Sequence, residues 1–154
     1  MRFVFRVLIF ILINFLGLLI GSVYTGIGAR STWYQELNKA PWTPPGYLFG
    51  VFWLFIMIFF GFYMSKLYAE SKSKKKIFVF FILQWILNLI WNPIFFYFRN
   101  IEIGLIVILC LTFLIFFFLY KYYKVIKLWS IFIFPYFLWL LIASSLNLYI
   151  YLFN

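Results

Sequence analysis

The sequence predicts an all-α membrane protein, a single domain over residues 1–154 built as a bundle of five transmembrane helices. The first observation is composition, since 68% of the residues are apolar and only 10% carry charge. The second is that five uncharged runs, each of about 18 residues or more, fill nearly the whole chain. They are Val7–Ala29, Ala40–Ser65, Ile77–Phe98, Ile103–Tyr120 and Leu128–Asn154. Helices are expected because hydrocarbon leaves every backbone polar group to be paired internally.

The basic residues are distributed unevenly about these spans. Five spans place the N-terminus and the second and fourth connections on one side of the membrane, with ten of the 13 basic residues. The other side holds Arg30, Lys39 and Arg99. The positive-inside rule therefore predicts a cytoplasmic N-terminus and an outside C-terminus. We expect a multi-pass protein of a bacterial cell membrane. We interpret the lysines at 72–76 as a topology anchor that also meets anionic lipid, and not as a nucleic-acid site.

Residue types that the chain lacks exclude several kinds of chemistry. Histidine and aspartate are absent and Cys110 is the one cysteine, so neither a Cys/His metal cluster nor a Ser-His-Asp set can form. The three glutamates, Glu36, Glu70 and Glu102, fall in different connections, which argues against paired-carboxylate catalysis. Cys110 lies in mid-span, where we expect a small buried apolar residue.

The first span is predicted over residues 3–27. Its basic start and apolar middle are also typical of a cleavable signal peptide, but the uncharged run is longer than the about 7–15 apolar residues of such a signal. We therefore expect a retained helix. Gly17 and Gly21 form a small-xxx-small pair that favours close helix packing within the chain. Asn14 lies near mid-membrane and should face other helices.

A polar, aromatic loop at residues 30–45 follows, and Pro44 and Pro45 stiffen its end. Such a loop is either a lid over a pocket or an interfacial connector, and the loop alone does not decide between them. The second span is predicted over 44–66, with Phe49, Trp53 and Phe60 on one helical face.

The third span, predicted over 77–98, carries a stripe of two amides and two aromatics, Gln84, Asn88, Trp91 and Phe95. Amides within the membrane need partners, so the stripe should face inward. Pro93 should kink this helix. Hydrogen bonding between helices is the simpler alternative to a binding role.

The fourth span, predicted over 102–120, consists mostly of aliphatic residues and phenylalanine, a composition that suits lipid contact and packing.

The fifth span, predicted over 128–152, carries Trp139, Ala143 and Asn147 on one face, with a small alanine between larger groups. A rise of about 1.5 Å per residue brings Trp53, Asn88 and Trp139 to one level of the bilayer. Trp91 and Ala143 then lie nearer the loop. Convergent indoles and amides beside a small residue favour a pocket for a flat aromatic ligand over a solid core.

Three segments resemble signatures of the TspO/MBR family, the tryptophan-rich sensory or translocator proteins. They are WYQELNKAPWTPPGYLFGVFW at 33–53, QWILNLIWNPIFF at 84–96 and PYFLWLLIASSLNLYIYLFN at 135–154. The resemblance covers the whole chain and implies a five-helix bundle, often a homodimer, that binds porphyrins such as protoporphyrin IX, sterol-like lipids and synthetic aromatics. The ligand-binding positions that match are Trp33, Tyr34, Pro45, Trp53, Gln84, Asn88, Trp139, Ala143 and Leu146, and we add Trp91 from its place on the stripe.

The chain departs from the family pattern at two places. Lys39-Ala40 replaces the usual Lys-Pro of the loop, which loosens the expected lid, and Pro41 comes one place later. No basic residue follows Tyr149 or Tyr151, so the cholesterol-recognition pattern of animal members is absent.

The leading functional prediction is a binding protein for porphyrins and similar planar hydrophobes, acting as sensor, scavenger or carrier. Its expected partners are the porphyrin, the lipid bilayer and a second copy of the chain, and no resident cofactor is required. Arg30 or Lys39 at the mouth is expected to meet the porphyrin propionates. The alternative is a light-driven porphyrin-degrading enzyme that uses Trp53 and Trp139, as the resemblance implies for some bacterial members. A lipid, sterol or porphyrin transporter is the third, because no coupling-ion site is visible.

Overall fold

Five helical stretches, each long and apolar enough to cross a membrane, make up the chain in a computed structural model that describes residues 1–154. The element order is α1 (Arg2–Gly28), a short α2 (Thr32–Glu36), α3 (Gly46–Glu70), α4 (Lys74–Asn92), a π-helical turn (Pro93–Tyr97), α5 (Ile101–Ile126), a 3-10 segment (Lys127–Phe132) and α6 (Phe134–Phe153). The predicted all-α, five-helix membrane fold is confirmed.

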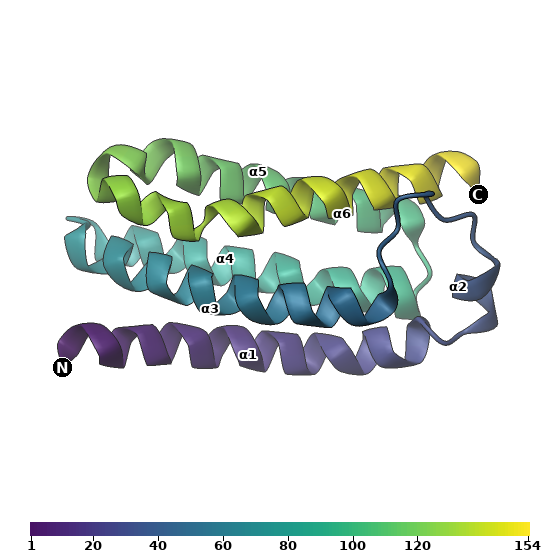
Figure 1. The fold of residues 1–154 in the computed structure, drawn as a ribbon, viewed down its shortest axis with the longest axis horizontal. Helices are drawn as coiled ribbons and strands as arrows, with labels where there is room; N and C mark the ends of the chain where they lie inside the picture. The colour runs from purple at the N-terminus through teal and green to yellow at the C-terminus, as the bar shows by residue number, and fades with distance from the viewer.

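The helices lie side by side in three tiers (Figure 1). Helix α1 packs on α3 and α4, and these pack in turn on the α5–α6 pair. The N- and C-termini lie at opposite ends of the bundle, as an odd number of spans requires. The loop with α2 leaves the end of α1 and reaches towards the end of α6 before the chain turns back into α3.

Large aromatic side chains fill the centre of the bundle. Phe60, Tyr63, Phe81, Phe118 and Tyr136 are all fully buried. The outward surface is apolar as well, and a large side chain such as Phe113 of α5 is exposed. A surface of this kind is stable in contact with lipid chains and unstable in water.

Small residues of α1 let α4 approach closely. A Cβ atom added to Gly17 would lie 2.6 Å from Nε1 of Trp85, and one added to Gly21 would lie 2.7 Å from Nδ2 of Asn92. The glycine pair therefore packs within the chain, as predicted. Asn14 also faces inward, since it is buried and its amide donates to the carbonyl of Met57 on α3 at 3.3 Å.

Several helices extend beyond the predicted spans at one end of the bundle. Helix α3 continues past Lys66 to Glu70, α4 begins at Lys74, and α5 continues past the predicted end at 120 to Ile126. A charge marks where a helix leaves hydrocarbon and not where the helix ends, because a lysine stem can lie along apolar surface with its ammonium in water.

The predicted fifth span starts too early. Lys127 has a positive φ of 47°, which ends α5, and residues 127–132 form a 3-10 segment. Helix α6 begins only at Phe134, with Pro135 in its first turn, where a missing N–H donor does no harm.

The expectation for Cys110 is wrong. It lies in the middle of α5 as predicted, but its side chain is exposed on the outward surface. Periodicity in α5 is blurred because apolar residues occupy every face, so the sequence could not tell the lipid side from the core side.

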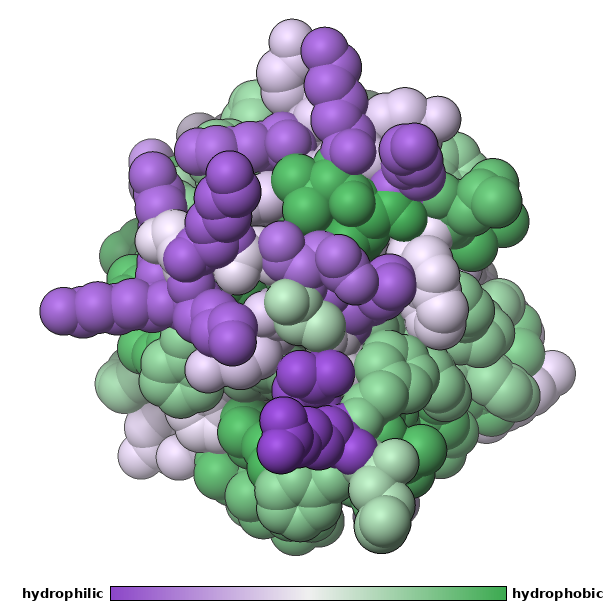
Figure 2. Space-filling model, turned by 90° about the vertical axis from the view of Figure 1, so that its left-hand side faces the viewer, coloured by the Kyte–Doolittle hydropathy of each residue, from purple (hydrophilic) through white to green (hydrophobic).

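Hydrophilic side chains gather over the end of the bundle that carries the N-terminus (Figure 2). We call this the basic end, defined by residues 1–6, 66–76 and 121–128, and the opposite end the loop end. Ten of the 13 basic residues belong to the basic end.

Candidate functional site

Tyr136 of α6 is the centre of a cluster that joins three helices. Its hydroxyl oxygen lies 2.8 Å from Nε2 of Gln84 on α4, which donates to it. Its ring lies edge-on to the ring of Trp53 on α3, at a centroid distance of 5.7 Å. Trp139 follows one helical turn later on the same face of α6. We call Trp53, Gln84, Tyr136 and Trp139 the aromatic site.

Trp139 lies between two phenylalanines of α3. The ring of Phe49 is edge-on to it at 5.4 Å and that of Phe52 is tilted over it at 4.7 Å. Trp139 itself is buried, whereas Phe52 is 42% exposed on the outward face of α3. A side chain open to lipid therefore covers an indole within the bundle.

Two buried polar atoms of the aromatic site have no hydrogen-bond partner, Oε1 of Gln84 and Nε1 of Trp139. If the Gln84 amide is rotated by 180°, its oxygen faces Tyr136 in place of its nitrogen, and the nitrogen is then the unpaired atom. An unpaired buried polar group costs about 1–3 kcal/mol, so native structures rarely keep one without a reason. The site thus has one free donor, and one free acceptor when the Gln84 amide donates to Tyr136.

A second group of polar and aromatic contacts lies on the loop-end side of the aromatic site. Nε1 of Trp91 donates to Oδ1 of Asn147 at 3.3 Å, and Nδ2 of Asn147 donates to the carbonyl of Ala143 at 2.9 Å. The Trp91 ring stacks on Phe95 at 5.2 Å. Leu146 is buried beside Asn147 on α6. This group connects the aromatic site to the loop.

Helix α2 covers the loop end. Ser31 caps it by accepting from the amide of Tyr34, and Trp33 and Tyr34 both lie edge-on to Phe95, at 5.7 and 6.3 Å. Burial raises the pKa of the Tyr34 hydroxyl above its ordinary value. The Lys39 ammonium lies over the Tyr34 ring at 4.6 Å. These contacts position α2 over the π-helical turn that follows α4.

Hydrogen bonds to α6 hold the far side of the loop. The backbone amide of Asn38 donates to Oδ1 of Asn154, while Nδ2 of Asn154 donates to the carbonyl of Asn38. Nδ2 of Asn38 donates to the carbonyl of Phe153. Nε1 of Trp42 donates to the hydroxyl of Ser145 at 3.1 Å. We call these four bonds the loop latch.

Removing latch contacts should open the loop. Asn154→Ala deletes two of these bonds and Asn38→Ala one, each worth about 1 kcal/mol or less at an exposed site. Tryptic cleavage after Lys39 should therefore accelerate in both variants, by about fivefold at most per bond, and more for Asn154→Ala. Equal cleavage rates in the parent and both variants would mean that the latch does not restrain the loop.

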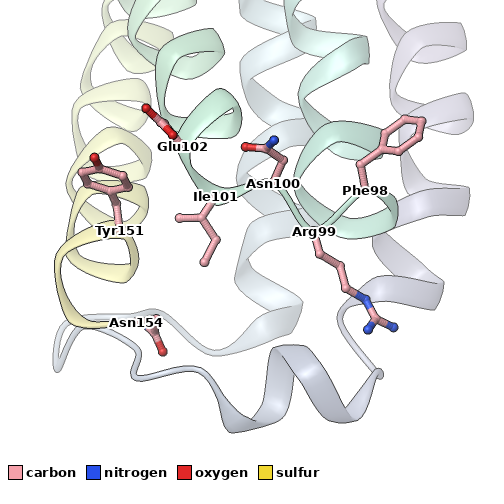
Figure 3. Close-up of a pocket in the computed structure, with 7 residues that line it drawn as sticks. All are labelled: Phe98, Arg99, Asn100, Ile101, Glu102, Tyr151 and Asn154. Carbon is pink, nitrogen blue, oxygen red and sulfur yellow. The ribbon is translucent and has the colours of Figure 1, made fainter.

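A cavity of about 370 Å³ lies beside the latch, between the start of α5 and the end of α6 (Figure 3). Tyr151 and Asn154 line it from α6, and Arg99 precedes α5 and extends towards α2. The Arg99 guanidinium lies 5.8 Å from the ring of Trp33. The cavity shares Asn154 with the latch and is separate from the aromatic site.

Comparison with known proteins identifies the family. A family model described as the TspO/MBR family matches residues 9–152, nearly the whole chain. This chain belongs to the TspO/MBR family. It is 32% identical over 139 residues to the tryptophan-rich protein TspO of Archaeoglobus fulgidus, covering 87% of each chain. It is 31% identical over 143 residues to the translocator protein of Bos taurus, covering 90% of this chain and 83% of the relative. Protein CrtK of Rhodobacter capsulatus is 28% identical, over 83% and 82%.

The positions carried over from the TspO/MBR signatures fall into two groups. Trp53, Gln84 and Trp139 come together at the aromatic site, and Ala143 and Leu146 continue the same helix towards the loop. Trp33, Tyr34 and Trp91 gather around Phe95. Asn88 is half-buried on α4, and its carbonyl accepts a bond from Nδ2 of Asn92. Pro45 is exposed just before α3 and contributes by ending the loop.

Sequence reasoning did not count Tyr136 or the latch residues among the site residues. Tyr136 could have been found, because it lies three residues before Trp139 and so shares its helical face. The Asn38–Asn154 contact left no comparable signal, since the two residues are 116 positions apart. The latch gives the loop a specific attachment to the end of α6.

Proposed function

We propose that this membrane protein binds porphyrin-like tetrapyrroles and similar planar hydrophobic molecules, as a sensor, scavenger or carrier. The observation that carries the proposal is the pair of unpaired polar groups at the aromatic site, the indole N–H of Trp139 and the amide of Gln84. A free-base porphyrin offers the complementary groups, pyrrole N–H donors and nitrogen or carboxylate acceptors. The surrounding rings offer faces and edges for stacking.

Entry of a planar ligand requires side chains to move. Phe49 and Phe52 rest on Trp139 and occupy the space in which a ring would stack. Phe52 is partly exposed to the lipid side, so its ring can swing outward at little cost in buried contact. We propose that the ligand enters beside Phe52 from the bilayer and displaces it from the indole face.

Binding would proceed without covalent chemistry. Trp53 and Trp139 supply stacking surface, Gln84 and the indole N–H orient the ring, and the loop closes over the bound molecule. Lys39 was expected at the mouth of the site. Its ammonium lies over the Tyr34 ring and donates a hydrogen bond to the carbonyl of Gln35. Cations on the loop-end side suit the acidic substituents of an amphipathic ligand. The relatives named sensory protein and translocator protein are consistent with either a sensing or a carrying role.

We also propose that the basic end faces the cytoplasm, on the positive-inside rule. A Cys110→Ser background with a single Lys75→Cys change should react with an impermeant maleimide only after the membrane is opened. Reaction in intact cells would reverse the proposed orientation.

Quenching of tryptophan fluorescence by protoporphyrin IX tests the proposed binding. The purified protein should show a saturable quench, and the saturable component should weaken when Trp53→Phe and Trp139→Phe are combined. A quench that rises linearly with porphyrin concentration, the same in the parent and the double variant, would overturn the proposal.

A further inference from the structure

A second cavity, an open hollow in the surface of about 350 Å³, lies at the basic end, far from the aromatic site. It is formed by the last turn of α3 and the junction between α5 and the 3-10 segment. Lys66 and Lys127 contribute cations to its wall, and Glu70 contributes one carboxylate. The wall therefore carries a net positive charge.

The two lysines are held differently. Lys66 is paired, because its ammonium lies 3.0 Å from the Glu70 carboxylate and 5.6 Å from the Trp129 ring centroid. Lys127 forms the sharp exit from α5 through its positive φ of 47°, a conformation that non-glycine residues adopt at a cost of about 1–3 kcal/mol. Its side chain is exposed and has no carboxylate partner. The cavity wall thus combines the free ammonium of Lys127 with the paired ammonium of Lys66.

The same cavity has an apolar side. Leu128, directly after Lys127, is 89% exposed, and Val125 is exposed on the preceding turn. Trp129 is half-buried and packs edge-on against Phe3 of α1 at 5.6 Å. Tryptophan next to lysines at the end of a span is typical of the membrane interface. Water is a poor environment for Leu128, whereas the start of an acyl chain would cover it.

We propose that this cavity binds the phosphate-bearing headgroup of an anionic phospholipid. The ammonium groups of Lys127 and Lys66 contact the phosphate oxygens, and Leu128 and Val125 contact the first methylenes of the acyl chains. Basic pockets between helices are suited to such headgroups. A free phosphate ion shares the charge but would leave the apolar side uncovered, and the apolar side therefore favours an amphipathic ligand.

General attraction between a basic surface and anionic lipid is the competing explanation. The lysines at 72–76 provide such attraction without lining the cavity. A matched pair of variants separates the two explanations. Lys127→Gly removes the cavity ammonium and leaves a residue that adopts the positive φ readily. Lys75→Ala removes the same charge from the same end but outside the cavity.

Native mass spectrometry of the full chain in detergent measures retention of phosphatidylglycerol against phosphatidylcholine with identical acyl chains. The parent should prefer phosphatidylglycerol, and Lys127→Gly should reduce that preference about fivefold, the factor expected for one lysine contact with an anionic headgroup. Lys66→Gln should lower it as well, and Lys75→Ala should lower it less than either cavity variant. Thermal unfolding of each variant establishes that the fold is kept.

Three outcomes would overturn the proposal. One is an equal loss of preference in Lys127→Gly and Lys75→Ala, which would indicate attraction to the surface as a whole. Another is an unchanged preference in both cavity variants. The third is that glycerol phosphate without acyl chains competes as well as the lipid, which would indicate a site for the free anion.

Discussion

Trp139→Phe should weaken protoporphyrin IX binding by about 10- to 100-fold, the factor for losing one buried hydrogen bond to a polar or charged group. The substitution keeps an aromatic ring between Phe49 and Phe52 but removes the indole N–H. That N–H has no partner in the free protein, so a ligand is the group that we expect to satisfy it. The titration is followed by the porphyrin absorbance, because the substitution also removes a fluorophore.

The same variant should keep or slightly gain stability. Removing an unpaired buried donor relieves its desolvation cost, whereas removing a donor that serves the fold would destabilise it. Gln84→Leu is a less clean change, because it also leaves the buried Tyr136 hydroxyl without its partner. Weaker binding together with an unchanged midpoint of thermal unfolding therefore assigns Trp139 to the ligand and not to packing.

Trp129→Phe is the matched control, since Trp129 lies at the basic end and outside the aromatic site. Its porphyrin affinity should equal that of the parent. If both substitutions lower affinity to the same degree, binding depends on indoles in general and the aromatic site has no special role.

The sequence predicted which helices carry the site because polar residues are rare in the spans. Gln84 and Asn88 were conspicuous in the apolar third span, and the need to pair an amide within hydrocarbon predicted that both would face inward. Gln84 is buried, whereas Asn88 is half-buried. Counting the rise per residue from each end of the membrane then placed Trp53 and Trp139 at a common level, and both do pack in one cluster with α3 and α6 side chains.

The sequence did not predict that side chains of the protein itself would occupy the space around Trp139. The sequence suggested an open pocket beside Ala143, whereas Phe49 and Phe52 close around Trp139. Phenylalanine is so frequent in this chain, with 24 copies, that its presence on a face carries no information. Helical spacing placed Phe49 on the face of Trp53, but the contact of Phe52 with Trp139 depends on packing between helices, which local spacing does not record.

Gly17→Ala should destabilise the protein by about 1–3 kcal/mol, the usual cost of overpacking a tight contact. A Cβ atom at this position would lie 2.6 Å from Nε1 and 3.2 Å from a ring carbon of Trp85. The indole cannot yield easily, because its N–H donates to the carbonyl of Ile13 at 2.9 Å. Helices α1 and α4 would have to separate, and that contact supports the placement of Gln84.

Gly50→Ala is the control, because it makes the same substitution at a position without close packing. Gly50 also lies within a transmembrane helix, but nothing stands within 4 Å of an added Cβ atom. Alanine is favoured over glycine in a helix interior by about 1 kcal/mol, so this variant should be neutral or more stable. The midpoint of thermal unfolding in detergent should therefore fall for Gly17→Ala and hold or rise for Gly50→Ala. A rise in both would mean that helix propensity outweighs the contact with Trp85, and that α1 and α4 are less closely packed than the structure has them.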